Sequence, residues 1–182
     1  MPWNFDDFAN LFSRFLDILD IQNCILVGHS FGGGIALHLA SKNERISSLI
    51  LIDSAGIPPD YSSRHFLFRL AQKTWRGFFL FKNKKITLMA LSDFCSGVLS
   101  RLSSSQKIWK MTTFSIYGKT QVFEQITQPT HILWGDTDEL FPRTHAEEFS
   151  RRIKNSATQY VEGNHDWVLL FPEKFLELME GI

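Results

Sequence analysis

Apolar residues recur along the chain at spacings that predict both helices and strands. Between positions 4 and 20 they follow a helical repeat, made by Phe8, Leu11, Phe12, Phe15, Leu16 and Leu19. This spacing predicts an amphipathic helix over 4–20. Residues 24–27 are all apolar, which is typical of a strand buried on both faces of a parallel sheet. Gly28 is expected to end this strand, and residues 31–41 are expected to form the next helix.

The later part of the chain repeats this alternation after a long interruption. Apolar runs predict strands at 49–52 and 130–134 and a weaker one at 158–161. Helices are predicted over 143–154 and from Pro172, because proline is tolerated in a first helical turn. The order predicts an α/β fold. We expect a parallel sheet of about four strands, with helices on both faces and right-handed crossovers.

The interruption divides the predicted core into residues 1–56 and 129–182, with an insertion at 57–128. Positions 58–125 hold 11 Lys and Arg against 3 Asp and Glu, a net charge of +8, which leaves −8 for the remainder. Eight of the 17 Phe also fall there. Helical spacing of its apolar residues predicts a mostly helical lid. Its charge either complements the acidic core or attracts anionic substrates, amphiphilic substrates or a membrane surface.

Composition excludes several classes of protein. Net charge over the 182 residues is zero, which argues against nucleic-acid binding through overall charge. Two cysteines, Cys24 and Cys95, form neither a disulfide framework nor a metal cluster, so we expect reduced thiols and a cytoplasmic location. No apolar run is long enough to span a membrane, and the start lacks the basic region of a secretory signal.

Residues 28–33 read Gly-His-Ser-Phe-Gly-Gly and fit the pattern G-x-S-x-G between a predicted strand and helix. A serine at such a tight turn projects its hydroxyl group away from the sheet, so Ser30 is a candidate nucleophile. Gly28 and Gly32 are expected to give the strand and helix room, and Gly33, Gly34 and Ala36 to extend it. The free N–H groups at the helix start, that of Phe31 first, are suited to bind an oxyanion.

A serine nucleophile needs a base, and the base needs an orienting acid. His165 follows the predicted strand at 158–161, and Asp136 and Asp138 follow the strand at 130–134. The carboxyl ends of parallel strands meet at one edge of a sheet, where catalytic groups gather. The order along the chain is therefore serine, aspartate, histidine.

These motifs resemble the α/β-hydrolase family, particularly its lidded serine esterases and carbon–carbon bond hydrolases. The resemblance rests on residues 28–33, on Trp134-Gly135-Asp136-Thr137-Asp138 and on Gly163-Asn164-His165. It implies that Asp138 rather than Asp136 is the acid. Asp53 stands where some relatives carry an acid, but we expect it to close its strand and open the insertion.

The resemblance implies acyl transfer to water by Ser30, His165 and Asp138, with the Phe31 N–H and His29 beside them in the turn. We expect a small acyl substrate, no cofactor and no metal. Hydrolysis of a carboxylic ester is the first hypothesis, and cleavage of a diketone from ring cleavage is the second. The motifs do not separate these reactions.

The resemblance also implies four further strands ahead of the helix at 4–20, one of which leads to a second oxyanion donor. Three explanations stay open. The chain is a piece of a longer hydrolase, or it pairs along residues 24–27 with a partner or a second copy. In the third explanation it is a non-catalytic relative whose basic, Phe-rich insertion binds lipid or protein.

Overall fold

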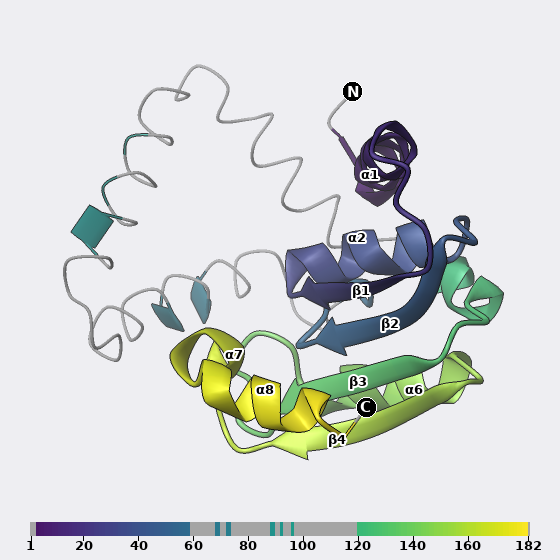
Figure 1. Cartoon of the computed structure of the whole chain (residues 1–182). Coiled ribbons are helices and arrows are strands. Elements are labelled where there is room, and N and C mark those ends of the chain that lie inside the picture. The colour runs from purple at the N-terminus through teal and green to yellow at the C-terminus, as the bar shows by residue number, and fades with distance from the viewer. Residues whose placement is uncertain are drawn as a thin grey trace.

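A computed structural model of the chain describes residues 3–58 and 120–181, together with positions 68, 69, 72, 73, 88, 89, 92 and 96. Figure 1 labels the helices and strands other than η2. In chain order, the elements are α1 (Phe5–Ile18), β1 (Cys24–His29), α2 (Phe31–Ala40), β2 (Ile46–Ile52), η2 (Thr120–Gln125), β3 (Thr130–Gly135), α6 (Arg143–Arg152), β4 (Ser156–Val161), α7 (Trp167–Leu170) and α8 (Pro172–Met179).

The strands form one parallel sheet in the order β1-β2-β3-β4 (Figure 1). The predicted α/β class and the strand count are therefore confirmed for the described residues. β2 and β3 are neighbours although the insertion separates them in sequence. Residues 49–52 of β2 pair with residues 130–133 of β3, which sets the two strand ends side by side.

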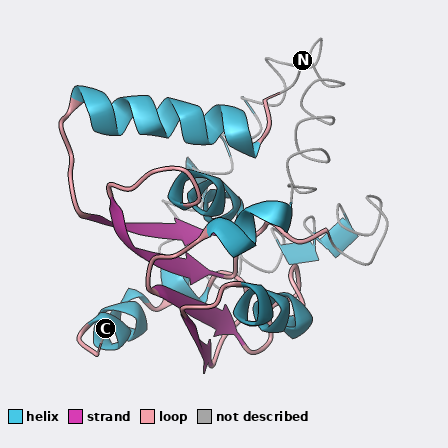
Figure 2. Ribbon diagram, turned by 90° about the vertical axis from the view of Figure 1, so that its right-hand side faces the viewer, coloured by secondary structure: helices cyan, strands magenta, loops and turns pink. Residues whose placement is uncertain are grey.

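Different helices cover the two faces of the sheet (Figure 2). Leu49 and Leu51 of β2 point into a core shared with α1, α2 and α6. Ile50 and Ile52 lie in a second core against α7 and α8. Because both faces are covered, a run of apolar residues is buried at every position from 49 to 52, as the pattern predicts.

β1 lies at an edge of the described sheet, and here two expectations fail. Ile25 and Val27 are 61% and 47% exposed, so one face of β1 is open rather than covered. Gly28 does not end the strand. β1 continues through His29 because Gly28 and His29 keep the parallel register with β2.

The insertion predicted at 57–128 lies mostly outside the described residues. Its described positions 68, 69, 72 and 73 are helical, and η2 ends it before β3. The lid, the domain division at 57–128 and the state of Cys95 therefore stay predictions. In the described part of the chain, no helix combines the length and the apolar character needed to cross a bilayer.

Candidate active site

Ser30 occupies a sharp turn between β1 and α2. Its backbone has φ +54°, in the left-handed region that side chains rarely adopt. Three hydrogen bonds hold this strained conformation. The Ser30 N–H donates to the Ile52 carbonyl at 3.0 Å, and the Ser30 carbonyl accepts from the N–H groups of Gly33 at 3.0 Å and Ala55 at 2.9 Å. The turn is thus tied to the end of β2, and strain at such a position is typical of functional sites.

Glycines let α2 lie close to the strands. A Cβ atom on Gly28 would lie 2.7 Å from the Gly33 Cα and 2.8 Å from the Ala36 Cβ. One on Gly33 would collide with Ser54, and one on Gly34 would collide with Phe5. The expectation for Gly32 is wrong, since a Cβ there would meet nothing within 4 Å. The close approach falls on the next two positions because Gly33 faces Ser54, just after β2, and Gly34 faces Phe5 of α1.

Ser30, His165 and Asp138 form a continuous chain of hydrogen bonds. His165 Nε2 lies 2.9 Å from Ser30 Oγ, and His165 Nδ1 lies 2.8 Å from Asp138 Oδ2. The histidine and aspartate side chains are 0% and 1% exposed. A carboxylate only accepts, so Nδ1 carries a hydrogen and Nε2 of the neutral ring is free to accept the serine proton. The structure therefore brings together the three residues that the motifs single out.

The loop after β3 explains why Asp138 rather than Asp136 faces the histidine. Asp138 Oδ1 accepts from the N–H groups of Leu140 at 2.7 Å and Phe141 at 2.9 Å, which leaves Oδ2 for His165. Asp136 is exposed, and its Oδ1 accepts from the Gly163 N–H at 3.0 Å. Asp136 thus ties the two loops together without touching the histidine.

Gly135 allows those loops to pack closely. A Cβ atom on Gly135 would lie 2.8 Å from the carbonyl oxygens of Gly163 and Asn164. The absence of a side chain at the end of β3 therefore lets the loop that carries His165 lie against the loop that carries Asp138.

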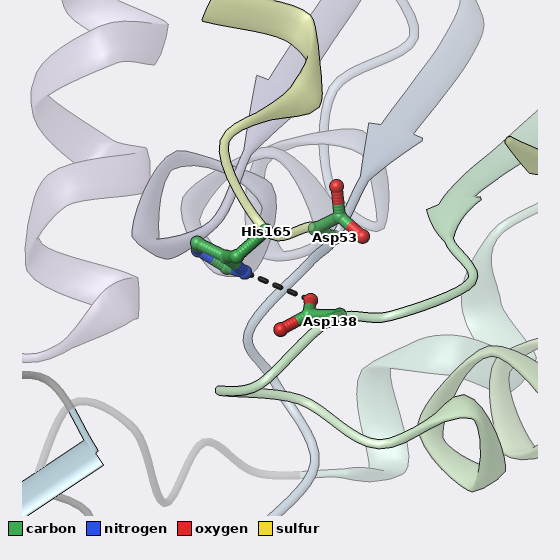
Figure 3. A group of neighbouring side chains, drawn as sticks. All are labelled: Asp53, Asp138 and His165. Carbon is green, nitrogen blue, oxygen red and sulfur yellow. Dashed lines mark hydrogen bonds and ion pairs between the residues drawn. The ribbon is translucent and has the colours of Figure 1, made fainter. Parts of the chain in front are cut away.

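Asp53 directly follows β2, as expected, and its side chain lies beside this pair, which the sequence did not predict (Figure 3). Its side chain is fully buried, and Oδ1 accepts from the Gly135 N–H at 2.7 Å. Burial, and then repulsion by Asp138, raise the pKa of Asp53 to about 9. The sequence offered one clue to this contact: Asp53 directly follows β2, and Asp138 lies in the loop after the neighbouring strand β3.

His29 and Phe31 flank the serine. His29 Nε2 lies 2.9 Å from the backbone carbonyl of His165, so a ring N–H there donates to the histidine loop. Burial lowers the pKa of His29, which favours the neutral ring in this role. Phe31 is the first residue of α2, and its backbone N–H therefore has no acceptor within the helix.

Two residues of the predicted insertion contact the loops of the site. Lys73 Nζ forms an ion pair with Asp166 Oδ1 at 2.8 Å, directly after His165. Arg69 Nη1 donates to the backbone carbonyl of Glu139 at 3.1 Å, directly after Asp138. Arg69 and Lys73 are four positions apart in the sequence, so one short stretch of the insertion reaches both loops.

One grouping of the described residues has the composition of a metal site. Asp53, Asp138 and His165 offer one ligand atom each within 4.8 Å of one another. Both ring nitrogens of His165 already have partners, Asp138 and Ser30. Binding a cation would require His165 to give up one of these bonds, so the geometry fits proton transfer better than metal ligation.

Comparison with known proteins identifies the family. A family model described as the alpha/beta hydrolase fold matches residues 2–172. The chain belongs to the α/β-hydrolase family. This α/β hydrolase is 26% identical over 183 residues to a poly(3-hydroxyalkanoate) depolymerase from Ectopseudomonas oleovorans. The match covers 90% of the chain but 62% of the depolymerase, so the chain spans less than two thirds of that relative.

Solved structures show the same fold. A serine hydrolase involved in carbazole degradation superposes with a TM-score of 0.78 at 18% identity, covering 100% of this chain and 71% of that one. A meta-cleavage product hydrolase from Pseudomonas fluorescens IP01 has a TM-score of 0.70 at 15% identity, covering 98% and 71%. At these identities the likeness establishes the fold of this α/β hydrolase.

Proposed function

We propose that this protein is a serine hydrolase in which Ser30 is the nucleophile, His165 the base and Asp138 the orienting acid. The observation that carries the proposal is the unbroken chain of hydrogen bonds, 2.9 Å from Ser30 to His165 and 2.8 Å from His165 to Asp138. Side chains within such distances can pass a proton without rearrangement.

The proposed reaction proceeds in two halves. Ser30 Oγ attacks the substrate carbonyl carbon while its proton moves to His165 Nε2, and the resulting oxyanion accepts from the Phe31 N–H. Asp138 stabilises the imidazolium through Nδ1. The bond to the leaving group then breaks, and that group takes the proton from Nε2. A water molecule gives a proton to Nε2 and attacks the acyl group, and Ser30 regains its proton on release of the acid.

The proposed substrate is a carboxylic ester, or a related acyl compound, with an apolar acyl group. Two observations support this class. The insertion is rich in phenylalanine, which suits an apolar pocket, and the depolymerase relative is named for a polyester. A cytoplasmic location and a small-molecule substrate belong to the same proposal.

A second candidate is cleavage of a carbon–carbon bond in a diketone, because meta-cleavage product hydrolases share the fold. The same three residues serve both reactions, so turnover separates them. The ester hypothesis predicts release of the alcohol from an aryl ester and no turnover of a vinylogous diketone. A non-enzymatic binding role predicts salt-sensitive liposome binding that survives Ser30→Ala.

A fluorophosphonate probe tests the proposal because it labels activated serines. We expect labelling of the purified chain that Ser30→Ala and His165→Ala abolish. Ser47→Ala is the matched control, since Ser47 is exposed on β2 and its hydroxyl group donates to the Cys24 carbonyl at 3.1 Å, away from the candidate site. A folded chain that the probe leaves unlabelled would contradict a hydrolase activity of these 182 residues.

A further inference from the structure

Asp53 directly follows β2, and its backbone is held in a conformation that few residue types adopt. Its N–H donates to the Leu133 carbonyl at 3.1 Å, and its φ is +42°. Asp53 itself is 0% exposed. A strained, buried aspartate is costly to keep, so its position beside Asp138 calls for a physical reason.

The carboxyl group of Asp53 is only half satisfied. Oδ1 accepts from the Gly135 N–H at 2.7 Å, whereas Oδ2 is buried and lacks a hydrogen-bond partner among the described residues, although the Trp167 indole lies close by. Among the described residues, no lysine or arginine forms an ion pair with Asp53. The polar groups that face it are the Asp138 carboxylate, the His165 ring and the Trp167 indole.

The carboxyl groups of Asp53 and Asp138 lie in one buried cluster, with an oxygen of each within 4.8 Å of the other. If both groups were ionised they would repel each other, and no ion pair with a described lysine or arginine would offset the repulsion on Asp53. A proton on Asp53 removes the second charge and also turns Oδ2 from an orphan acceptor into a donor. The Asp138 carboxylate is a strong acceptor close by, with one oxygen inside that distance. One proton therefore satisfies both carboxyl groups.

We propose that Asp53 carries a proton on Oδ2 at neutral pH and donates it to Asp138, so that the two carboxyl groups share one negative charge behind His165. Asp53 is then a positioning residue. It holds the Gly135 N–H through one oxygen and Asp138 through the other, which fixes Asp138 Oδ2 against His165 Nδ1. The kinetic consequence rests on the proposed function, but the protonation does not.

The balance of forces on the carboxyl group agrees with this assignment. Burial, followed by the charge of Asp138, raises the pKa of Asp53 to about 9, and the N–H groups of Gly135 and of the Trp167 indole oppose these effects without cancelling them. Asp53 thus stays protonated through the neutral range while Asp138 provides the charge.

Infrared spectroscopy of the chain labelled with carbon-13 aspartate tests the protonation without any need for activity. We expect a carbonyl band of a protonated aspartic acid at neutral pH, lost in Asp53→Asn and lost in the wild type as the pH rises past about 9. A wild-type spectrum at neutral pH with no such band, or a band that persists in Asp53→Asn, would overturn the proposal.

Kinetics of phosphonate labelling test the positioning role. Asn can accept from Gly135 and donate to Asp138, so Asp53→Asn should label at a rate near that of the wild type at neutral pH. Asp53→Ala should be slower by on the order of tenfold to a hundredfold, the loss expected for one hydrogen bond to a charged group. The wild-type rate should fall above pH 9, and the Asn variant should lack that fall.

The outcomes are distinguishable. An Asn variant as slow as the Ala variant at neutral pH would mean that Asp53 acts as an ionised acid, which contradicts the proposal. If neither the wild type nor any variant were labelled, the proposed hydrolase function would be wrong. The infrared band would still show whether Asp53 is protonated.

Discussion

At the scale of single residues, Asp138 has two oxygens with separate tasks. Oδ1 accepts from two backbone N–H groups, and Oδ2 accepts from His165. In Asp138→Asn the amide oxygen must stay at the Oδ1 position to satisfy Leu140 and Phe141. Its NH₂ group then faces Nδ1 and imposes the tautomer with hydrogen on Nε2. That tautomer cannot take the Ser30 proton, so we expect phosphonate labelling to slow by on the order of 10⁴-fold.

Asp136→Asn is the matched control for this substitution. Its amide oxygen can still accept from the Gly163 N–H, and the side chain is exposed. Labelling should therefore stay close to that of the wild type. Equal losses in the two variants would mean that Asp138 has no special role.

The protonation of Asp53 also predicts how stability changes with pH. Between pH 3.8, the ordinary pKa of an aspartate, and the raised pKa of about 9, the folded chain holds a proton on Asp53 that the unfolded chain has released. The free energy of unfolding should therefore fall as pH rises through this window. Urea denaturation across it should show a steeper fall for the wild type than for Asp53→Asn, and parallel curves would refute the prediction.

Asp6 changes the free energy of unfolding with pH in the opposite direction and over a different pH range. Burial raises its pKa, but hydrogen bonds from Lys42 and His38 outweigh this and lower the pKa to about 2. Its contribution is present above 3.8 and is lost as pH falls toward 2, so it does not obscure the effect of Asp53.

At the scale of elements, packing between α2 and its neighbours depends on two of three consecutive glycines. A methyl group at Gly33 or Gly34 would collide with Ser54 or Phe5, whereas Gly32 faces open space. We expect Gly33→Ala and Gly34→Ala to lower the free energy of unfolding by about 1–3 kcal/mol through overpacking. Gly32→Ala should be neutral or stabilising by up to about 1 kcal/mol, because alanine favours the helix. Urea denaturation of the three variants measures this, and a uniform response would contradict it.

Periodicity predicted the long elements well and the close contacts poorly. The helix from Phe5 and the strand ending at Ile52 follow from apolar spacing, because each buries a regular face. α7 has four residues, too few to display a helical repeat, and no spacing predicted it. Gly28, Gly32 and Gly33 look alike in sequence, and only the positions of Ser54 and Ala36 tell them apart.

The same limit applies to the candidate site. Ser30 and His165 carry local motifs, so they could be predicted from the sequence. Asp53 has no such motif, and its contact with Asp138 arises from the parallel register of β2 and β3. That register follows from pairing between strands separated by the insertion, which no local pattern encodes.

At the scale of the whole molecule, a basic residue of the insertion pairs with an acidic residue of the core beside the site. Lys73 pairs with Asp166 at 2.8 Å, and their side chains are 17% and 12% exposed. Such an ion pair supports the interpretation that the basic insertion complements an acidic core. Because Asp166 follows His165 directly, docking of this part of the insertion is coupled to the position of the base.

Lys73→Met should therefore slow phosphonate labelling and make it less sensitive to salt. It leaves Asp166 largely buried without its partner, and the lost attraction is the part that salt screens. Lys154→Met is the control, since Lys154 is exposed beyond α6 and should keep both the rate and its salt dependence. If the ion pair is the cause, Asp166→Asn combined with Lys73→Met should cost no more than the larger single loss. Additive losses would instead place the two residues in separate roles, and the insertion would then have no coupling to His165 through this contact.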